Sequence, residues 1–219
     1  MTTTYTKTKE IQDQSLFELQ PEKDIQRNKF LFGLSRTSDW GKNLRWFLEK
    51  RLIAKVGRVE YISRNNAMRP IIKFLDYYSP KNTDILQEYF IPMNRFVEFV
   101  DSLRGIIQKE HINLLSITIR YVPQDKESFL PYAKENSFAF VLYVNQGLDE
   151  NEIKRTQMWT RGIVDLALGY GGSYYLPYQL YPTKEHLIKS YLEFNEFINR
   201  KQKYDPEERF INKLYEQYR

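Results

Sequence analysis

The sequence predicts an α+β fold built on a ferredoxin-like split βαβ core, with a helical segment before it and further helices after it. Two observations predict this core. The hydrophobic period changes from two to about 3.6 and back along residues 84–178, and the elements so marked follow the order β-α-β-β-α-β. In that arrangement helices cover one face of an antiparallel sheet. The other face is free to be a binding surface.

Each element of the core has its own local signal. Runs rich in β-branched and aromatic residues indicate strands, and apolar residues at helical spacing indicate buried helix faces. Pro92 ends the first strand, Asp149 can cap the second helix, and Gly169 with Gly171-Gly172 ends it. The expected strands are 84–91, 114–122 and 137–144, with a short extended piece at 173–178, and the expected helices are 94–110 and 149–168.

The flanks divide the chain into three expected parts: an N-terminal part over 1–82, the α+β core over 83–180 and a C-terminal helical segment over 181–219. The best boundary signal is the polar turn Ser79-Pro-Lys-Asn82. Outside the core we expect a strand over 2–8, helices over 24–34 and 38–53, a loop over 63–70, and helices over 183–201 and 206–218.

Composition excludes several classes of protein. A hydrophobic content of 42% with 28% charged residues is that of a soluble globular protein. There is no cysteine and only His111 and His186, so we expect no disulfide, no metal centre and no cysteine nucleophile. The net charge is +5, but the basic residues are interspersed with nearly as many acidic ones, which argues against nucleic acid as a partner. No leader or spanning segment is recognisable, so a cytoplasmic location is expected, with association at a membrane surface left open.

Two charged residues fall in the middle of apolar strands. Glu88 shares a strand face with Leu86 and Phe90, and Arg120 shares one with Ser116 and Thr118, opposite the apolar set of 115, 117, 119 and 121. Such residues are rarely buried alone. They are either a solvated ion pair, or the lining of a cleft in which charge orients a polar ligand.

A tyrosine-rich segment follows the double glycine. Gly171-Gly-Ser-Tyr-Tyr-Leu-Pro-Tyr178 sets three tyrosines around a proline. Tyrosine hydroxyls can hold a sugar or polyol and can act as a general acid. Aromatic packing at a domain seam explains the same pattern, and both interpretations stay open at this point.

Taken together, these segments resemble the vanillyl-alcohol-oxidase-type FAD-linked oxidoreductases, in the branch of aldonolactone oxidases, alditol oxidase, decaprenylphosphoryl-ribose oxidase and sterol Δ24-reductase-like proteins. The matching motifs are Gln87-Glu-Tyr-Phe-Ile-Pro92, Ile117-Thr-Ile-Arg-Tyr121, the tyrosine segment above, and Tyr204-Asp-Pro-Glu-Glu-Arg-Phe-Ile-Asn212, which is similar to a closing D-P-x-x-x-F-x-N signature. They occur in the family's order over residues 63–218.

In such enzymes an N-terminal domain binds FAD and a cap domain lays its sheet over the flavin. The resemblance implies that this chain is the cap and C-terminal half without the FAD-binding half, so that FAD belongs to the intact protein and the isolated chain is inactive. It places Glu88, Arg120, Tyr175 and Tyr178 at the catalytic site, with Arg120 stabilising developing negative charge. The further candidates are Thr118, Tyr174 and Gln87 for substrate and Asn212 for cofactor.

The chain also departs from the family pattern. Tyr178 stands where the family has a lysine, and Thr118 where alditol oxidase has an acidic residue. Tyr175 stands where lactone oxidases have a histidine and the ribose oxidase has a tyrosine. A tyrosine hydroxyl is not a fixed cation.

The sequence therefore indicates the substrate-binding region of an FAD-dependent oxidoreductase for a sugar, aldonolactone or polyol-like molecule. The expected partners are the FAD-binding domain, in the same or a separate chain, a small-molecule substrate and, over the exposed sheet face, a second copy of the chain. The alternative is a ferredoxin-like module that binds a ligand or partner and has no redox role.

Overall fold

The computed structural model describes residues 3–8, 17–53, 61–69 and 72–219. The chain divides into two compact units, Met1–Tyr78 and Ser79–Arg219. The division falls where the turn Ser79-Pro-Lys-Asn82 begins. The further division into a core over 83–180 and a C-terminal segment over 181–219 stays a prediction.

A helical hairpin is the longest helical part of the first unit that the structure describes. Helix α1 (Ile25–Thr37) is followed directly by α2 (Asp39–Leu48), because Ser38 leaves the helical conformation and its Oγ accepts a hydrogen bond from the Gly41 amide at 3.0 Å. Gly41 is required here, since a Cβ at this position would come within 2.1 Å of the Leu34 carbonyl oxygen. The expected helix over 38–53 is confirmed, and its last turn, Glu49–Ile53, is a π-helix.

Two expectations for the first unit are wrong. Residues 3–8 are in neither helix nor strand, and Thr2 lies outside the described residues. Alternating threonines favour extended backbone, but a strand forms only where a neighbour takes up its hydrogen bonds. The expected loop over 63–70 contains helix α3 (Arg64–Met68), because Ser63 caps it by accepting from the Asn66 amide at 3.3 Å, and a single turn η3 (Lys73–Leu75) follows.

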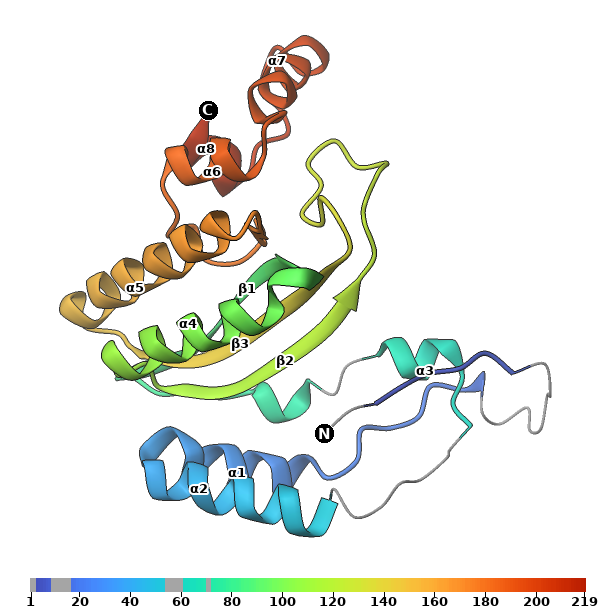
Figure 1. The fold of residues 1–219 in the computed structure, drawn as a ribbon, viewed down its shortest axis with the longest axis vertical. Helices are drawn as coiled ribbons and strands as arrows, with labels where there is room; N and C mark the ends of the chain where they lie inside the picture. The colour runs from blue at the N-terminus through green and yellow to red at the C-terminus, as the bar shows by residue number, and fades with distance from the viewer. Residues whose placement is uncertain (1–2, 9–16, 54–60, 70–71) are drawn as a thin grey trace. The chain divides into compact units, whose positions relative to one another are not determined.

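The second unit contains the predicted sheet. It has four strands, all antiparallel neighbours, in the order β2-β3-β1-β4. Figure 1 shows β2, β3 and β1 of this sheet side by side. This is the strand order of a split βαβ fold, so the predicted fold class is confirmed. The strands are β1 (Asn82–Pro92), β2 (Leu114–Val122), β3 (Ser137–Gly147) and the two-residue β4 (Ser173–Tyr174).

Helices α4 (Phe96–Lys109) and α5 (Glu150–Gly169) lie on one side of this sheet (Figure 1). Asp149 caps α5 as predicted, accepting from the Glu152 amide at 3.0 Å. The single turn η4 (Met93–Arg95) leads from β1 into α4. Apolar side chains of the helices and of the covered sheet face form one core, which includes Tyr89, Ile91, Phe99, Leu103, Phe140, Leu142, Trp159 and Ile163.

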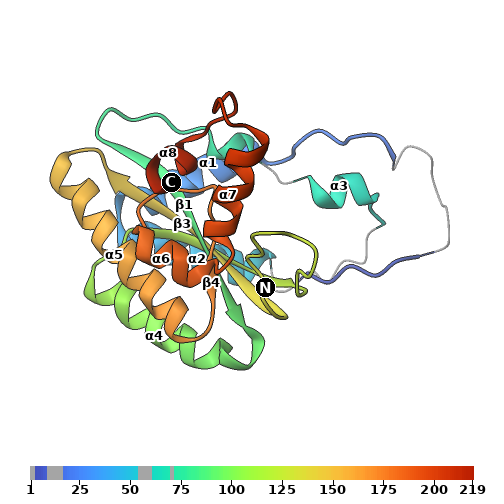
Figure 2. The same ribbon diagram turned by 90° about the horizontal axis from the view of Figure 1, so that it is seen from above.

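The C-terminal helices lie together and close one end of this core (Figure 2). The helix predicted over 183–201 is broken into α6 (Lys184–Ser190) and α7 (Phe194–Tyr204). The break lets both Tyr191 and Phe194 enter the core, where each is almost fully buried. The helix predicted over 206–218 forms only as α8 (Lys213–Tyr218), because Asp205 holds the preceding turn by accepting from the Arg209 and Phe210 amides, each at 2.9 Å.

Candidate functional site

The register of the sheet decides which side chains share its uncovered face. Directly paired residues point to the same side of an antiparallel sheet. Glu88 pairs with Val141, and Val141 with Thr118. Arg120 is two residues beyond Thr118 and points the same way. The alternate residues point to the helices and are the core positions Ile85, Tyr89, Ile91, Phe140, Leu142 and Val144. Glu88, Thr118 and Arg120 therefore lie on the face opposite α4 and α5, the open face.

Glu88 is the most perturbed acid of this face. It is part-buried, and this burial raises the pKa of its carboxyl group above the ordinary value. Two neighbours act in the opposite direction: the positive charge of Arg120, and a hydrogen bond that the Tyr178 hydroxyl donates to the carboxylate. Burial is the largest of the three effects. The result is a carboxylate that binds a proton more readily than an ordinary glutamate.

The tyrosine segment reaches Glu88 through the turn that ends α5. Gly171 has a positive φ of 76°, and a Cβ on Gly172 would come within 2.3 Å of the Phe90 carbonyl oxygen. These glycines allow the chain to turn against β1. β4 pairs with β1 only at Ser173 and Tyr174, and the Tyr175 amide then donates to the Glu88 carbonyl at 3.0 Å.

Aromatic rings border the Glu88 carboxylate. The rings of Tyr175 and Tyr178 meet edge to face with 5.1 Å between centroids, and Tyr175 is 6.2 Å from Phe90. Burial, assisted by the negative charge of Glu88, raises the pKa of Tyr178, so its phenol stays neutral and donates. Of the predicted site residues, the structure brings Glu88, Arg120, Thr118, Tyr175 and Tyr178 to one face.

Tyr132 is a member of this cluster that sequence reasoning missed. It lies in the loop between β2 and β3, and its ring stacks on Phe90 at 4.5 Å between centroids and meets Tyr175 edge to face at 5.7 Å. The apolar run Phe129-Leu-Pro-Tyr132 in an otherwise polar loop is the signal that could have found it.

Gln87 and Tyr174 are not part of the cluster. Both are buried, and the register points them to the helix-covered side; Tyr174 pairs with Tyr89. Among the described residues, Nε2 of Gln87 and the hydroxyl of Tyr174 have no hydrogen-bond partner. Their place in two matching motifs favoured substrate contact, but strand alternation sends each residue next to a site residue to the opposite face. We therefore drop both from the open-face site.

Asn212 has a structural role at the start of α8. Its Oδ1 accepts from the Tyr215 amide at 2.9 Å and so caps α8. Asp205 of the same signature is held by Lys201 and by backbone amides, which lower its pKa to about 2. Much of the closing signature thus shapes a turn and a helix start. A contact of Asn212 with the cofactor stays a prediction.

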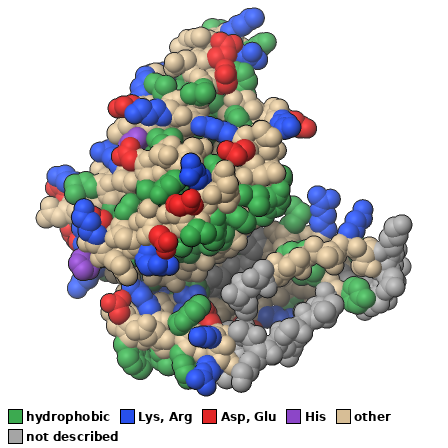
Figure 3. Space-filling model, in the orientation of Figure 1, with side chains coloured by type: hydrophobic (Ala, Val, Ile, Leu, Met, Phe, Trp, Pro, Cys, Tyr) green, Lys and Arg blue, Asp and Glu red, His purple; other side chains and the backbone are tan. Residues whose placement is uncertain are grey.

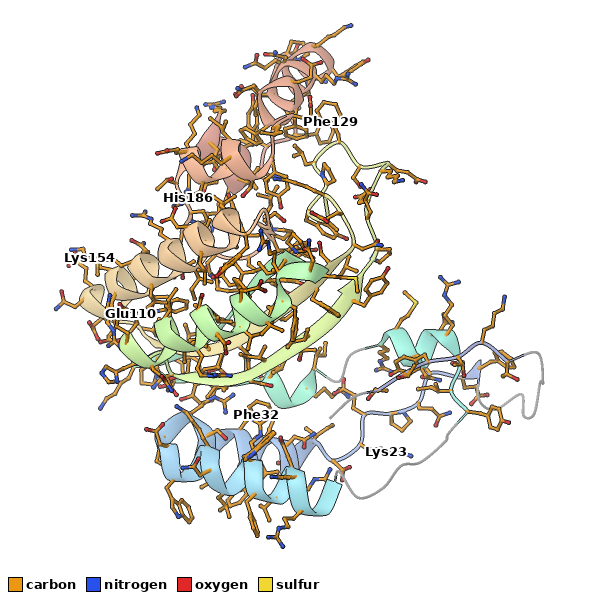
Figure 4. The ribbon with its side chains drawn as sticks, in the orientation of Figure 1. Lys23, Phe32, Glu110, Phe129, Lys154 and His186 are labelled. Carbon is orange, nitrogen blue, oxygen red and sulfur yellow. The ribbon has the colours of Figure 1, made fainter. Side chains whose placement is uncertain are left out.

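Two hollows border the C-terminal helices. One, of about 910 Å³, lies between α8 and the segment after β4, and Tyr178 and Asn212 line it. The other, of about 530 Å³, is lined by rings of the β2–β3 loop and α7, with Phe129 beside α7 in Figure 4. On the face in view in Figure 3, acidic and basic side chains are interspersed. That distribution is unlike the concentrated basic stripe of a nucleic-acid interface.

The fold and this face define a class: an α+β domain with a helix-covered sheet whose other face bears a carboxylate, a guanidinium and tyrosines. The family model for D-arabinono-1,4-lactone oxidase matches residues 6–218. The chain belongs to this family, and it corresponds to the C-terminal aldonolactone-oxidase-type domain of an FAD-linked oxidase. No protein of curated function matches it. None of the helices within the described ranges is long and apolar enough to cross a membrane.

The described residues fit one side of a flavin site. The open face offers an arginine, a carboxylate and tyrosine hydroxyls, which suit the substrate and ring side. The chain's glycine cluster does not suit the pyrophosphate, because it ends α5 and does not begin a helix. The amides of Gly171 and Gly172 are already bonded to the Leu168 and Ala167 carbonyls, at 2.9 and 2.8 Å.

Proposed function

We propose that this chain supplies the substrate-binding face of an FAD-dependent oxidoreductase that acts on a sugar, aldonolactone or polyol-like substrate. The observation that carries the proposal is the raised pKa of Glu88 on the same sheet face as Arg120. Perturbed acids beside a fixed charge are typical of functional sites. The family match supports the reaction class.

Glu88 is the proton acceptor in this proposal. Oxidation of an alcohol to a carbonyl releases the hydroxyl proton, and a carboxylate with a raised pKa takes a proton better than an ordinary one. The hydrogen bond from Tyr178 orients the carboxylate and keeps its ionised form available. FAD, when bound, supplies the acceptor for the hydride that leaves the carbon bearing this hydroxyl.

Arg120 stabilises the negative charge that develops on the substrate oxygen as the proton leaves. Tyr175 and Tyr178 provide hydroxyl donors for the remaining hydroxyls of the substrate. Because Tyr178 stands where the family has a lysine, Arg120 is the one cation among the candidate residues that can stabilise this negative charge. This composition favours an uncharged, polyhydroxylated substrate.

We further propose that a separate domain, in the same or another chain, holds FAD and closes over the open face. The turn formed by Gly169 to Gly172 caps α5 and offers no phosphate cradle, which supports this arrangement. The flavin then lies against the face that carries Glu88 and Arg120. Asn212, at the start of α8, is the residue of this chain that we assign to contact with the cofactor side.

Calorimetric titration with D-arabinono-1,4-lactone tests the proposal. The wild-type chain should bind the lactone, and Arg120→Met should weaken binding tenfold or more, since a hydrogen bond to a charged group contributes about 1.5–3 kcal/mol. Arg104→Met is the matched control, because Arg104 is exposed on α4, on the other side of the sheet, and pairs only locally with Asp101 at 3.1 Å. Equal affinities for the three proteins would favour the alternative of a binding module without a redox role.

A further inference from the structure

The loop between β2 and β3, residues 123–136, extends from the sheet edge back to the tyrosine segment. Backbone and side-chain hydrogen bonds hold the two ends of this loop together. The Asp125 amide donates to the Ala133 carbonyl at 2.9 Å, and the Gln124 amide to Oδ1 of Asn136 at 3.0 Å. Ala133 is fully buried. The loop is therefore an ordered lobe with a fixed base.

Two further contacts fix the far side of the lobe. The hydroxyl of Ser173, in β4, donates a hydrogen bond to the backbone carbonyl of Tyr132. At the tip, the Arg200 guanidinium of α7 lies over the Phe129 ring, 4.6 Å from its centroid. Ser173 is almost fully buried, so its hydroxyl attaches the lobe to the strand that leads into the tyrosine segment.

The Tyr132 ring occupies a specific place in the aromatic cluster. One side of it stacks on Phe90, with an interplanar angle of 29°, and Tyr175 meets it at 82°. Its exposed fraction is 37%, so part of the residue is still open to a ligand. Tyr132 thus contacts both Phe90, which lies on the same sheet face as Glu88, and Tyr175, which follows β4.

We infer that the β2–β3 loop is part of the substrate site, and that Tyr132 is a substrate-positioning residue that holds Tyr175 beside Glu88 and walls the site with its ring. This inference rests on the proposed function of the open face. Ligand sites combine aromatic walls with a few placed polar groups, and sites attached to rigid elements hold their geometry best. The substrate class is that of the proposed function: a compact, uncharged, polyhydroxylated ring.

We expect the ring of Tyr132, and not its hydroxyl, to contribute to lactone affinity. Tyr132→Leu removes the edge-to-face contact with Tyr175 and should weaken lactone binding about three- to tenfold. Tyr132→Phe keeps the ring and should bind within about twofold of wild type. Tyr121→Leu is the matched control, because Tyr121 is an exposed tyrosine of β2 that pairs with Phe138 on the helix side.

Calorimetric titration of the full chain with D-arabinono-1,4-lactone distinguishes the outcomes, with thermal unfolding recorded for each variant. Weaker binding by Tyr132→Leu alone, restored in Tyr132→Phe, supports the inference. Wild-type affinity in Tyr132→Leu, together with weakened binding by Arg120→Met, overturns the inference and leaves the proposed function standing. Equal weakening by the Tyr121 control also overturns it. If wild type binds no lactone, the proposed function fails, and this inference with it.

Ser173→Ala tests the same inference without changing the cluster's rings. It removes the hydroxyl that holds the Tyr132 carbonyl. We expect about a threefold loss of lactone affinity, because the loop is then attached less firmly to β4. Unchanged affinity in a folded Ser173→Ala chain would contradict the role of the loop, even if Tyr132→Leu should fail to fold.

Discussion

Tyr178, in the segment after β4, donates a hydrogen bond to Glu88 in the middle of β1. The bond lowers the pKa of Glu88 and raises that of Tyr178, while burial raises both. The positive charge of Arg120 acts on the same carboxylate from β2, with β3 lying between the two strands. The proton affinity of Glu88 is thus set by three parts of the chain that are distant in sequence.

The titration of Glu88 should respond to both neighbours. Arg120→Met and Tyr178→Phe should each raise the pKa of Glu88 further, because each removes a stabiliser of the carboxylate, and Arg120→Met should raise it more. Carbon-13 NMR of labelled glutamate carboxyls measures both values. Arg104→Met should leave them unchanged. A lowered pKa in the Arg120 variant would contradict the placement of the arginine.

Glu88 should also make stability depend on pH. Because its folded-state pKa is raised above the ordinary value of 4.5, the folded chain binds this proton more tightly than the unfolded chain. Its contribution therefore destabilises the fold increasingly as the pH rises from 4.5 through the folded pKa.

Glu88→Gln should accordingly raise the melting temperature at pH 7 and lose that gain as the pH falls toward 4.5. Glu98→Gln, at an exposed site of α4, should show no such gain. Thermal unfolding across this pH range provides the test. A Glu88→Gln chain that is less stable at pH 7 would argue against the raised pKa.

Gly172 should be intolerant of a side chain. A Cβ there would lie 2.3 Å from the Phe90 carbonyl oxygen and 2.9 Å from that of Ala167, so the tyrosine segment must move away from β1. Gly172→Ala should destabilise the chain by about 2 kcal/mol or more in urea denaturation and weaken lactone binding. Gly169 lies three residues earlier, and a Cβ at this position meets nothing within 4 Å, so Gly169→Ala should fold and bind normally. Identical behaviour of the two variants would contradict the close approach.

His186 should act as a helix cap. Its Nδ1 accepts from the Thr183 amide at 3.1 Å, the Thr183 hydroxyl accepts from the His186 amide at 3.2 Å, and Nε2 bonds to Asp165 at 2.9 Å. Figure 4 shows His186 on α6. His186→Ala should cost about 1 kcal/mol in urea denaturation. His186→Gln should recover part of this loss, because glutamine also serves in a capping box. Equal losses in both variants would contradict the capping role.

Local sequence patterns predicted the core well because each of its elements repeats a period. β2 has the predicted bounds, and Asp149 and the glycines after α5 act as the predicted cap and stop. The break at Tyr191 was not predictable from period, because it depends on burial of a ring whose hydroxyl bonds to the distant Tyr174 carbonyl.

The site was partly predictable for the same reason. Alternation along β1 grouped Glu88 with Leu86 and Phe90, and alternation along β2 grouped Arg120 with Thr118. The pairing of both strands with Val141 of β3 then shows that the two groups share one face. Gln87 and Tyr174 came from motif membership, which does not distinguish the two faces of a strand. The apolar run that includes Tyr132 marks the β2–β3 loop as unusual, but the place of Tyr132 in the site depends on its tertiary contact with Phe90.

The most direct test of the open-face site is an NMR titration of the arginine-labelled chain with D-arabinono-1,4-lactone. Arg120 lies on the proposed substrate face, while Arg104 lies on α4 and Arg155 on α5. We predict a saturable shift of the Arg120 Nε–H signal, assigned with Arg120→Met, and unmoved signals for the other two. An unmoved Arg120 signal at saturating lactone, or equal shifts of all three, would contradict the account.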